Sequence, residues 1–366
     1  GAYISFMDNS STNWYNTRIG CVADVFHIQT GGTTRAVIDD NSRINLSNNG
    51  GTGNTVFGYQ ACNFSNAGQH VAIGHLAMKG HSTAGSNTGT YNVAIGYNSL
   101  GGVGSDSVDL SGGSNVSIGH SSMRAASSAS NNVAIGAASL LVCTTGGKNI
   151  AIGQNAAVAL TTANKTIFIG EESGDAVTVT GGSNESDGTI GIGHQALTAL
   201  TSGGSNTAVG YQAGLALTEG DNNTILGYGA MDDMVEGDDN VAIGMNALGG
   251  ALDATADASD GNIAIGKAAM GGAWVTATSE YNVAIGHEAL DDALAGSNYN
   301  VAIGRRAATQ LTTGDKNISI GADSLYASVD VDKVIAIGAD ACTGVMTADA
   351  DGTIAIGFSS LSAHTS

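Results

Sequence analysis

A five-residue apolar pattern, Asn-Val-Ala-Ile-Gly, recurs along most of this chain and first appears unchanged at residues 92–96. Aligned on its glycine, the pattern occurs in seventeen copies, most often 17 residues apart. The glycines are Gly58, Gly74, Gly96, Gly119, Gly136, Gly153, Gly170, Gly193, Gly210, Gly227, Gly244, Gly266, Gly286, Gly304, Gly321, Gly338 and Gly357. A fixed period of this length is typical of stacked coils, because one coil cannot bury its apolar side chains alone. The sequence therefore predicts a repeat array.

Two large aliphatic positions flank a small one in each copy. The residues three and one before the glycine are mostly Val and Ile, and the residue between them is usually Ala. Alternate residues of an extended backbone point to the same side, and β-branched residues favour strands. We therefore expect one short strand per coil, with the large residues in the core. The expected core isoleucines are Ile95, Ile135, Ile152, Ile243 and Ile285.

The small residues between them are then expected to face outward. Because a surface of Ala and Ser lets another backbone approach closely, we interpret this face as the contact between identical chains, three around one axis. A monomeric solenoid with an exposed, Ala-lined sheet is the alternative. The fold class predicted is an all-β parallel β-roll or β-solenoid of about 17 coils, homotrimeric, and roughly 80 Å long at about 4.8 Å per coil.

The residue four before the glycine is Asn in twelve copies. In a stack of coils these side chains would lie above one another and form a ladder of amide hydrogen bonds. Alternatively, each Asn serves only the turn that enters its own strand. Both interpretations remain open from the sequence, and both are structural.

Residues 1–50 do not follow the repeat. Short alternating segments at residues 3–7, 18–30 and 34–46 predict strands separated by Asn, Ser and Gly turns. A repeat array needs its first coil covered, because that coil otherwise exposes its core and its strand edge. We therefore predict a small β-rich leader or cap at residues 1–50 and the solenoid array at residues 51–366.

Five intervals between glycines exceed 17 residues by three or more, and in these five the surplus falls after the Leu or Met position that follows the glycine. The insertions occupy residues 80–91, 101–114, 175–188, 249–261 and 271–281, so all leave the coil at one corner. Exposed aromatic rings on a rigid scaffold suit sugar stacking or protein contact. The candidates for receptor contact are Tyr91, Trp274, Tyr281 and Tyr299. The alternative is that each ring only covers the corner of its own coil.

No metal site or cofactor is expected. The residue after the glycine is Tyr or His in eight copies, but the four histidines are not in adjacent coils, so each is expected as a partly exposed ring at a corner. These residues are Tyr59, His75, Tyr97, His120, His194, Tyr211, Tyr228 and His287. The four cysteines lack the spacing of a zinc site or of a disulfide framework, and Cys62 and Cys342 occupy the Leu or Met position, where Cys is a small apolar residue.

Charge and hydropathy exclude several partners. The net charge of −20 disfavours nucleic acid and anionic lipid, and no apolar run is long enough to insert into a membrane. Pro is absent, as a continuous hydrogen-bonded ladder requires. The acidic residues gather in turns, where we expect them to keep the array soluble. Calcium bound between coils is the alternative.

The sequence contains no arrangement typical of an enzyme. It lacks a Gly-x-Ser-x-Gly elbow, a His-Glu-x-x-His zinc motif and a phosphate-binding loop, and its acids lie in turns. We therefore expect no catalysis. Two less favoured alternatives are an ice-binding solenoid, which needs a regular Thr ladder, and a polysaccharide depolymerase, which needs carboxylates in a groove.

The segment Asn-Val-Ala-Ile-Gly-Tyr-Asn-Ser-Leu at residues 92–100 resembles the head repeats of trimeric autotransporter adhesins. It is even more similar to repeats in the tail fibres of tailed bacteriophages. The likeness covers about residues 54–361, and residues 4–6, 18–20 and 36–38 are similar to segments that precede such arrays in phage fibres. Since the chain lacks an initiating Met, we interpret it as a processed product or an excerpt.

The resemblance implies a homotrimeric, left-handed parallel β-roll that projects from a surface and adheres. We therefore expect a structural tail-fibre protein of the virion, outside the cell, that attaches to a host cell-surface glycan or protein. Its corner loops or its tip would contact the receptor, and other tail proteins would be further partners. The alternative is a trimeric adhesin head on the bacterial outer surface.

Overall fold

The structure is a computed structural model that describes residues 2–5, 17–22, 25–30, 33–38, 44–46, 54–62, 68–79, 88–102, 110–178, 186–250, 258–274, 277–292 and 294–362. Apart from one 3-10 turn, η1 (Ala348–Ala350), the regular elements of these residues are strands. The chain divides into two compact units, Gly1–Gly147 and Lys148–Ser366. The division falls within the repeat array and not at residue 50.

The N-terminal part of the first unit is an antiparallel sheet with strand order β1-β2-β3-β4-β5. Its strands are β1 (Ala2–Ser5), β2 (Thr17–Val22), β3 (Val25–Thr30), β4 (Thr33–Ile38) and β5 (Ile44–Leu46). Ile19 of β2 pairs with Ile28 of β3, and the pairing of β3 with β4 shifts between Ile28 and Gln29. The β-rich leader expected from the sequence is present, and its role as a cap stays a prediction.

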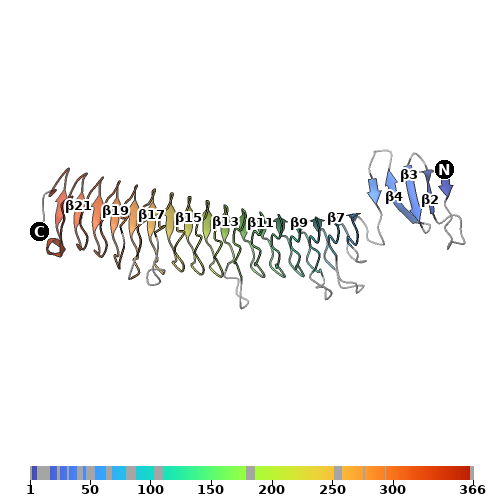
Figure 1. Ribbon diagram of the computed structural model, residues 1–366, viewed down its shortest axis with the longest axis horizontal. Helices are drawn as coiled ribbons and strands as arrows, with labels where there is room; N and C mark the ends of the chain where they lie inside the picture. Colours follow the sequence, from blue (N-terminus) through green and yellow to red (C-terminus); the bar gives the residue numbers. More distant parts are fainter. Residues whose placement is uncertain are drawn as a thin grey trace. The chain divides into compact units, whose positions relative to one another are not determined.

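The repeats form a parallel β-solenoid of about 16 coils with 17-residue spacing, built on 17 strands of the described residues, in agreement with the predicted architecture. Each coil contributes one three-residue strand, drawn as the series of short arrows in Figure 1. In the first unit these are β6 (Thr55–Phe57), β7 (Val71–Ile73), β8 (Val93–Ile95), β9 (Val116–Ile118) and β10 (Val133–Ile135). In the second unit they are β11 (Ile150–Ile152), β12 (Ile167–Ile169), β13 (Ile190–Ile192), β14 (Thr207–Val209), β15 (Thr224–Leu226), β16 (Val241–Ile243), β17 (Ile263–Ile265), β18 (Val283–Ile285), β19 (Val301–Ile303), β20 (Ile318–Ile320), β21 (Ile335–Ile337) and β22 (Ile354–Ile356).

Within each unit, equivalent residues of successive coils lie directly above one another. For example, Ala94 of β8 is opposite Ser117 of β9, and Ile95 is opposite Ile118. Because the register never shifts between these strands, each position of the repeat becomes a column that runs along the unit. The core and the surfaces of the solenoid therefore consist of such columns.

The core is on the opposite side of the strands from the one predicted. The small middle residue is buried, with Ala94 fully inaccessible, whereas the flanking Val and Ile are partly exposed. Ile135 and Ile285 keep 36% of their surface exposed, and Ile95, Ile152 and Ile243 are also incompletely buried. The prediction that these five isoleucines form the core of the chain is wrong, and so is the outward placement of the Ala and Ser column.

The width of the coil explains this reversal. A 17-residue coil is narrow, so a strand residue that points inward meets side chains from the opposite turn, and in most coils this residue is Ala or Ser. The space that remains is filled by one residue four positions after the glycine and another about seven positions after it. The buried residues at these positions include Leu100, Met123, Leu140, Leu197, Met231 and Leu290 at the first, and Cys143, Leu160, Leu200, Leu217, Met234 and Leu311 at the second.

The glycine that follows each strand is required by two constraints. Gly96 has a φ of +126°, which an L side chain rarely adopts. A Cβ at this position would also lie 2.6 Å from the carbonyl oxygen of Gly119 in the next coil. The corner can therefore be stacked only if every copy has glycine there.

The buried Asn column forms the expected ladder and also holds a turn, although this is the turn that leads into the next strand and not the one that enters its own. The backbone N–H and the side-chain amide of Asn115 both donate to Oδ1 of Asn92, at 2.9 and 3.0 Å. The same amide also donates to the carbonyl oxygen of Ala129 at 2.8 Å, which lies in the turn that leads into the next strand, β10. The Asn ladder is thus confirmed, and each Asn also fixes a turn.

Candidate adhesive surface

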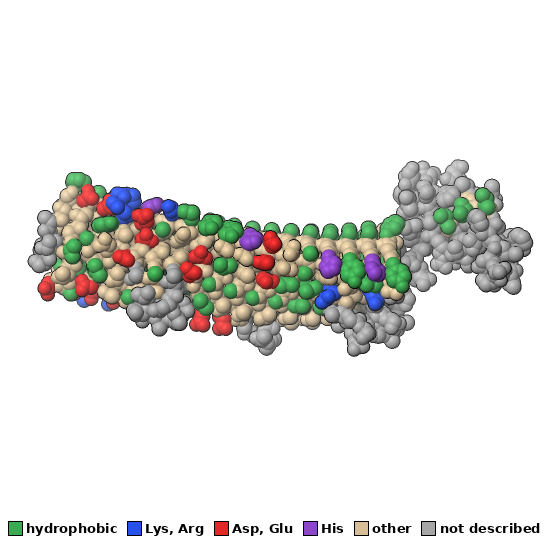
Figure 2. Space-filling model, in the orientation of Figure 1, with side chains coloured by type: hydrophobic (Ala, Val, Ile, Leu, Met, Phe, Trp, Pro, Cys, Tyr) green, Lys and Arg blue, Asp and Glu red, His purple; other side chains and the backbone are tan. Residues whose placement is uncertain are grey.

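A continuous apolar stripe lines the outer face of the strands in each unit. We define the apolar stripe as the residues three and one before each glycine, for example Val241 and Ile243 of β16. Thr55, Thr207 and Thr224 are its polar members. Figure 2 shows hydrophobic side chains in a row along the edge of the array that carries the strands. An extended apolar surface of this kind marks a contact site, because soluble proteins rarely leave one open to water.

The residue after each glycine lies beside this stripe, and where successive coils have Tyr or His there the rings form an aromatic column. In the first unit the rings of Tyr59, His75, Tyr97 and His120 follow one another with centroids 5.3 to 5.4 Å apart. Tyr97 and His120 stack, whereas His75 is inclined by 55° to Tyr59 and by 66° to Tyr97. In the second unit His194, Tyr211 and Tyr228 stack at 5.2 and 5.0 Å, with planes 7° from parallel. The rings are partly exposed, as predicted. Where the rings stack, as in the second unit, they cover one another's faces and offer mainly their edges, with hydroxyl and imidazole groups, to a partner.

Three of the four receptor-contact candidates are exposed. Tyr91, Tyr281 and Tyr299 precede the buried Asn of their coils and expose 60%, 50% and 55% of their surface. Tyr281 and Tyr299 stack across neighbouring coils, with centroids 5.3 Å apart. Each of the three has a positive φ of about 60°, so the backbone holds its side chain out on the turn. Their contact with a receptor stays a prediction.

Trp274 is not available to a receptor, because only 1% of its surface is exposed. It lies eight residues after Gly266, as the buried Leu294 lies eight after Gly286, so it fills the second core position of its coil. The prediction of an exposed Trp274 is therefore wrong. The insertion shifts this core position by one residue, which the sequence pattern did not reveal. Residues 80–87, 103–109, 179–185, 251–257 and 275–276 of the five insertions lie outside the described residues.

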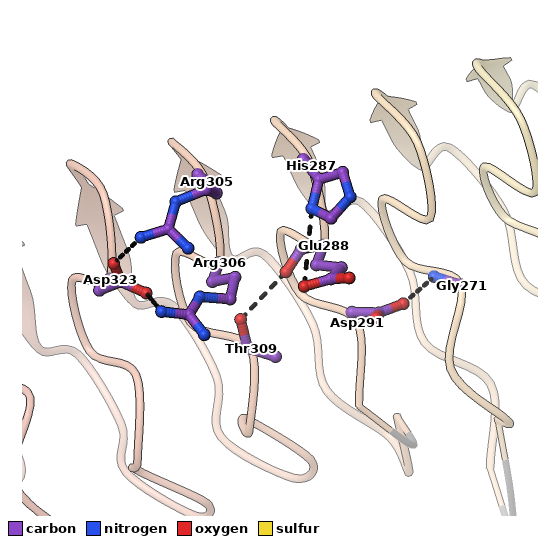
Figure 3. A network of polar contacts seen from close by, with 8 residues as sticks. All are labelled: Gly271, His287, Glu288, Asp291, Arg305, Arg306, Thr309 and Asp323. Carbon is purple, nitrogen blue, oxygen red and sulfur yellow. Dashed lines mark hydrogen bonds and ion pairs between the residues drawn. The ribbon is translucent and has the colours of Figure 1, made fainter.

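Charged side chains near one end of the second unit interact between successive coils (Figure 3). Both Arg305 and Arg306 form ion pairs with Asp323 of the next coil. The guanidinium group of Arg306 also lies 5.0 Å from the ring centroid of Tyr326. His287 and Glu288 lie 3.5 Å apart on the neighbouring coil. The two arginine pairs run along the columns, whereas the His287–Glu288 contact lies within one coil.

The acidic turn residues have a structural role that the sequence analysis missed. Oδ1 of Asp238 accepts a hydrogen bond from the backbone N–H of Asp221 in the preceding coil, and Asp260 accepts one from Asp238. Asp332 and Asp351 continue the pattern by accepting from Asp315 and Asp332. The recurrence of Asp or Asn six residues before the glycine was the signal that could have revealed this ladder.

Several of these carboxyl groups hold protons more tightly than usual. Burial raises the pKa of Asp232 to about 6, helped by the charge of Asp233, and burial together with Glu288 raises that of Asp291 to about 6. The pKa of Asp260 is also raised, first by burial. In the described part of the chain, no group of three or more His, Cys, Asp or Glu is arranged to hold a metal ion.

The cysteines in the array are core residues. Cys62, Cys143 and Cys342 are buried and unpaired, and burial raises the pKa of the Cys143 thiol to about 12. At neutral pH such a thiol stays protonated and is a poor nucleophile. The expectation that Cys62 and Cys342 act as small apolar residues is confirmed. Among the described residues, no helix is long and apolar enough to cross a bilayer.

No family model matches this chain, and neither does any curated protein or solved structure.

Proposed function

We propose that this chain is the shaft of an adhesive fibre, in which identical copies associate through the apolar stripe and their outer columns contact a host-cell surface. The observation that carries the proposal is the in-register stripe of partly exposed Val and Ile in coil after coil. It replaces the Ala and Ser column as the surface for self-association. The proposed protein is structural, and no catalytic step is assigned to it.

Repetition makes such association favourable. Completing the burial of an Ile that is one-third exposed contributes roughly 0.5–1 kcal/mol. One coil therefore contributes little compared with the cost of bringing chains together. Many coils that meet in register add their contributions, so a long array associates where a short one would not.

A homotrimer is the arrangement that the resemblance of the repeat supports. Three stripes can face one axis and shield one another from water, and closed cyclic symmetry leaves no stripe uncovered. The aromatic columns then lie outside the axis or along its seams. Their hydroxyl and imidazole groups suit a host-cell glycan or protein, because Tyr combines an apolar body with a polar tip.

The similarity to phage repeats supports a place in a virion tail, where other tail proteins would adjoin the fibre and no nucleic acid or membrane would be bound. A trimeric adhesin on a bacterial surface would use the same shaft. Sequencing the complete gene separates the two, since an adhesin requires a membrane anchor beyond the shaft.

Mass in solution tests the proposal directly. Light scattering coupled to gel filtration should give a mass three times that of the 36.2 kDa chain at micromolar concentration. A monomer at that concentration would contradict the proposed role of the apolar stripe and with it the fibre.

A further inference from the structure

The apolar stripe cannot by itself decide how two copies align. Its positions repeat at every coil, so sliding one copy along another by one coil of about 4.8 Å again places Val and Ile against Val and Ile. Strand-like surfaces without an irregular feature are prone to such slippage. In coiled coils, charged residues beside the apolar seam fix alignment and partner choice. The equivalent positions here are the columns on either side of the stripe.

Two ridges flank the stripe in the second unit. The leading ridge consists of the residues five before each glycine, and its members include the exposed Lys148, Lys165, Lys316 and Lys333. The trailing ridge consists of the residues two after each glycine, and its acidic members are the partly exposed Glu172, Glu288, Asp323 and Asp340. The buried Asn, the strand and the corner glycine separate the ridges within each coil.

Charges on the two ridges are matched coil by coil. Three of the four lysines of the leading ridge have an acidic residue on the trailing ridge of the same coil, seven residues later in the sequence. The matched pairs are Lys165 with Glu172, Lys316 with Asp323, and Lys333 with Asp340. The fourth lysine, Lys148, has Asn155 at that position.

These matched pairs are not formed within one chain. The three strand residues alone span about 10 Å, and the turn residues on both sides lengthen the path. Among the described residues, the ion pairs of the second unit run between or within trailing corners, such as Arg306–Asp323 and His194–Glu171, and none crosses the stripe. Asp323 is already paired with Arg305 and Arg306 of the preceding coil, but none of the three lysines forms an ion pair within the described residues, so their charges are left for a neighbouring copy.

We propose that the leading ridge of one copy lies against the trailing ridge of the next copy at the same coil, so that these charge pairs lock the copies parallel and in register. The partner is thus a second copy of this chain, aligned coil to coil. This inference rests on the proposed self-association through the apolar stripe. In a closed ring every copy presents one leading and one trailing ridge, so every seam carries the same pairs.

Displacing the copies by one coil worsens the match in either direction. If each leading ridge meets the trailing ridge of the following coil, two attractive contacts remain, Lys148 with Glu172 and Lys316 with Asp340. If each leading ridge meets the trailing ridge of the preceding coil, the only attractive contact of a lysine is Lys333 with Asp323. Lys316 then lies against Arg306, which carries the same charge. Alignment without displacement satisfies three lysines and also places Tyr299 opposite Arg306, a cation–π combination.

Cross-linking of the full chain tests the alignment. The double variant Lys333→Cys/Asp340→Cys, treated with a short bismaleimide, should give covalent trimers on a reducing gel. The matched control Lys333→Cys/Arg306→Cys puts the same thiols two coils apart on the same ridges and should give at least fivefold less covalent trimer. The two single-residue variants Lys333→Cys and Asp340→Cys measure any reaction of native cysteines.

The outcomes separate the two proposals. If light scattering shows a trimer but the same-coil pair fails to cross-link, or the two-coil pair cross-links equally well, the alignment is overturned and the fibre proposal stands. If the unmodified protein is a monomer, both fall.

Charge exchange provides a second measurement. Lys165→Glu should weaken the trimer, seen as at least a fewfold rise in the concentration at which it dissociates, because like charges then meet at each seam. Lys165→Glu/Glu172→Lys should restore association. A double variant as weak as the single variant would contradict the pairing of these two residues between copies.

Discussion

Phe168 lies directly against Gly174, so that a Cβ on this glycine would come within 2.4 Å of Cε1 of the Phe168 ring. Phe168 occupies the strand position that holds Ala in most coils, yet it is fully buried. Gly174 occupies the position that holds Leu or Met in other coils. Gly191 occupies the Ala position of the next coil, and a Cβ there would lie 2.9 Å from Cδ1 of the Phe168 ring. The coil thus exchanges one large and one small residue while its core volume is conserved.

This compensation predicts that Gly174→Ala is more destabilising than an ordinary glycine replacement. The added methyl group overlaps the Phe168 ring, so we expect a loss of about 2–4 kcal/mol in the free energy of unfolding, measured by denaturant titration. Gly188→Ala is the control, because Gly188 has a similar positive φ of 78° but nothing within 4 Å of its Cβ position. Its loss should be about 1 kcal/mol from backbone strain alone. Equal losses of unfolding free energy for Gly174→Ala and Gly188→Ala would show that the packing of the Phe168 ring does not require the absence of a side chain at residue 174.

The reversed orientation of the strands predicts opposite effects for adjacent residues of β16. Ile243→Lys places a charge on the apolar stripe, so it should convert the trimer to a monomer while the far-ultraviolet circular dichroism is kept. Ala242→Leu enlarges a core residue with no compensating glycine in its coil, so it should destabilise the chain itself by about 1–3 kcal/mol. A folded trimer formed by the Ile243→Lys variant would contradict the stripe as an interface.

The Asn ladder predicts a pH-dependent defect. In Asn223→Asp, a carboxylate would face Oδ1 of Asn206 and the carbonyl oxygen of Gly237, which now accept hydrogen bonds from the Asn223 amide at 3.0 and 2.8 Å. Burying an unpaired charge is costly, so the melting temperature at pH 7 should fall and should recover in part when acid protonates the new group. The exposed neighbour provides the control, since Asn222→Asp should change the melting temperature little.

The raised pKa values of Asp232 and Asp291, about 6 in each case, predict greater stability in mild acid. A carboxyl group whose pKa is higher in the folded state binds protons preferentially there, so its contribution is complete below its unfolded pKa near 4 and is lost as the pH rises through 6. Thermal unfolding should therefore occur at a higher temperature at pH 5 than at pH 7. Asp232→Asn/Asp291→Asn should flatten this dependence, whereas Asp349→Asn, at an exposed site in η1, should not.

The exposed Tyr281–Tyr299 stack predicts a loss of binding without a loss of fold. Tyr281→Ala/Tyr299→Ala should lower binding to a panel of bacterial surface polysaccharides at least tenfold, because both rings and hydroxyl groups are removed from one surface. Mass and melting temperature should stay unchanged. By contrast, Trp274→Ala should destabilise the chain by about 3–5 kcal/mol, since Trp274 is a core residue. Unchanged binding by the double Tyr variant would remove these residues from the adhesive surface.

The sequence by itself determined the parts of this protein that repeat. The spacing of the glycines predicted one strand per coil, and the recurrent Asn before most strands predicted a structural role for that column in a ladder or a turn. Each of these features is encoded within a segment of about twenty residues, and that segment recurs along the chain. The repeat pattern is therefore enough to predict them. The partly exposed rings at Tyr97 and His120 followed from the same reasoning.

Only the tertiary structure decided which face of each strand is inside. Alternation places Ile95 and Val93 on one side and Ala94 on the other, but it does not say which side the coil closes over. The narrow interior of the coil makes that choice, since it accepts Ala94 beside Leu100 and leaves the larger residues outside. The burial of Trp274 and the space that Gly174 leaves for Phe168 depend on the same closure, because each is a contact between residues that a column pattern treats separately.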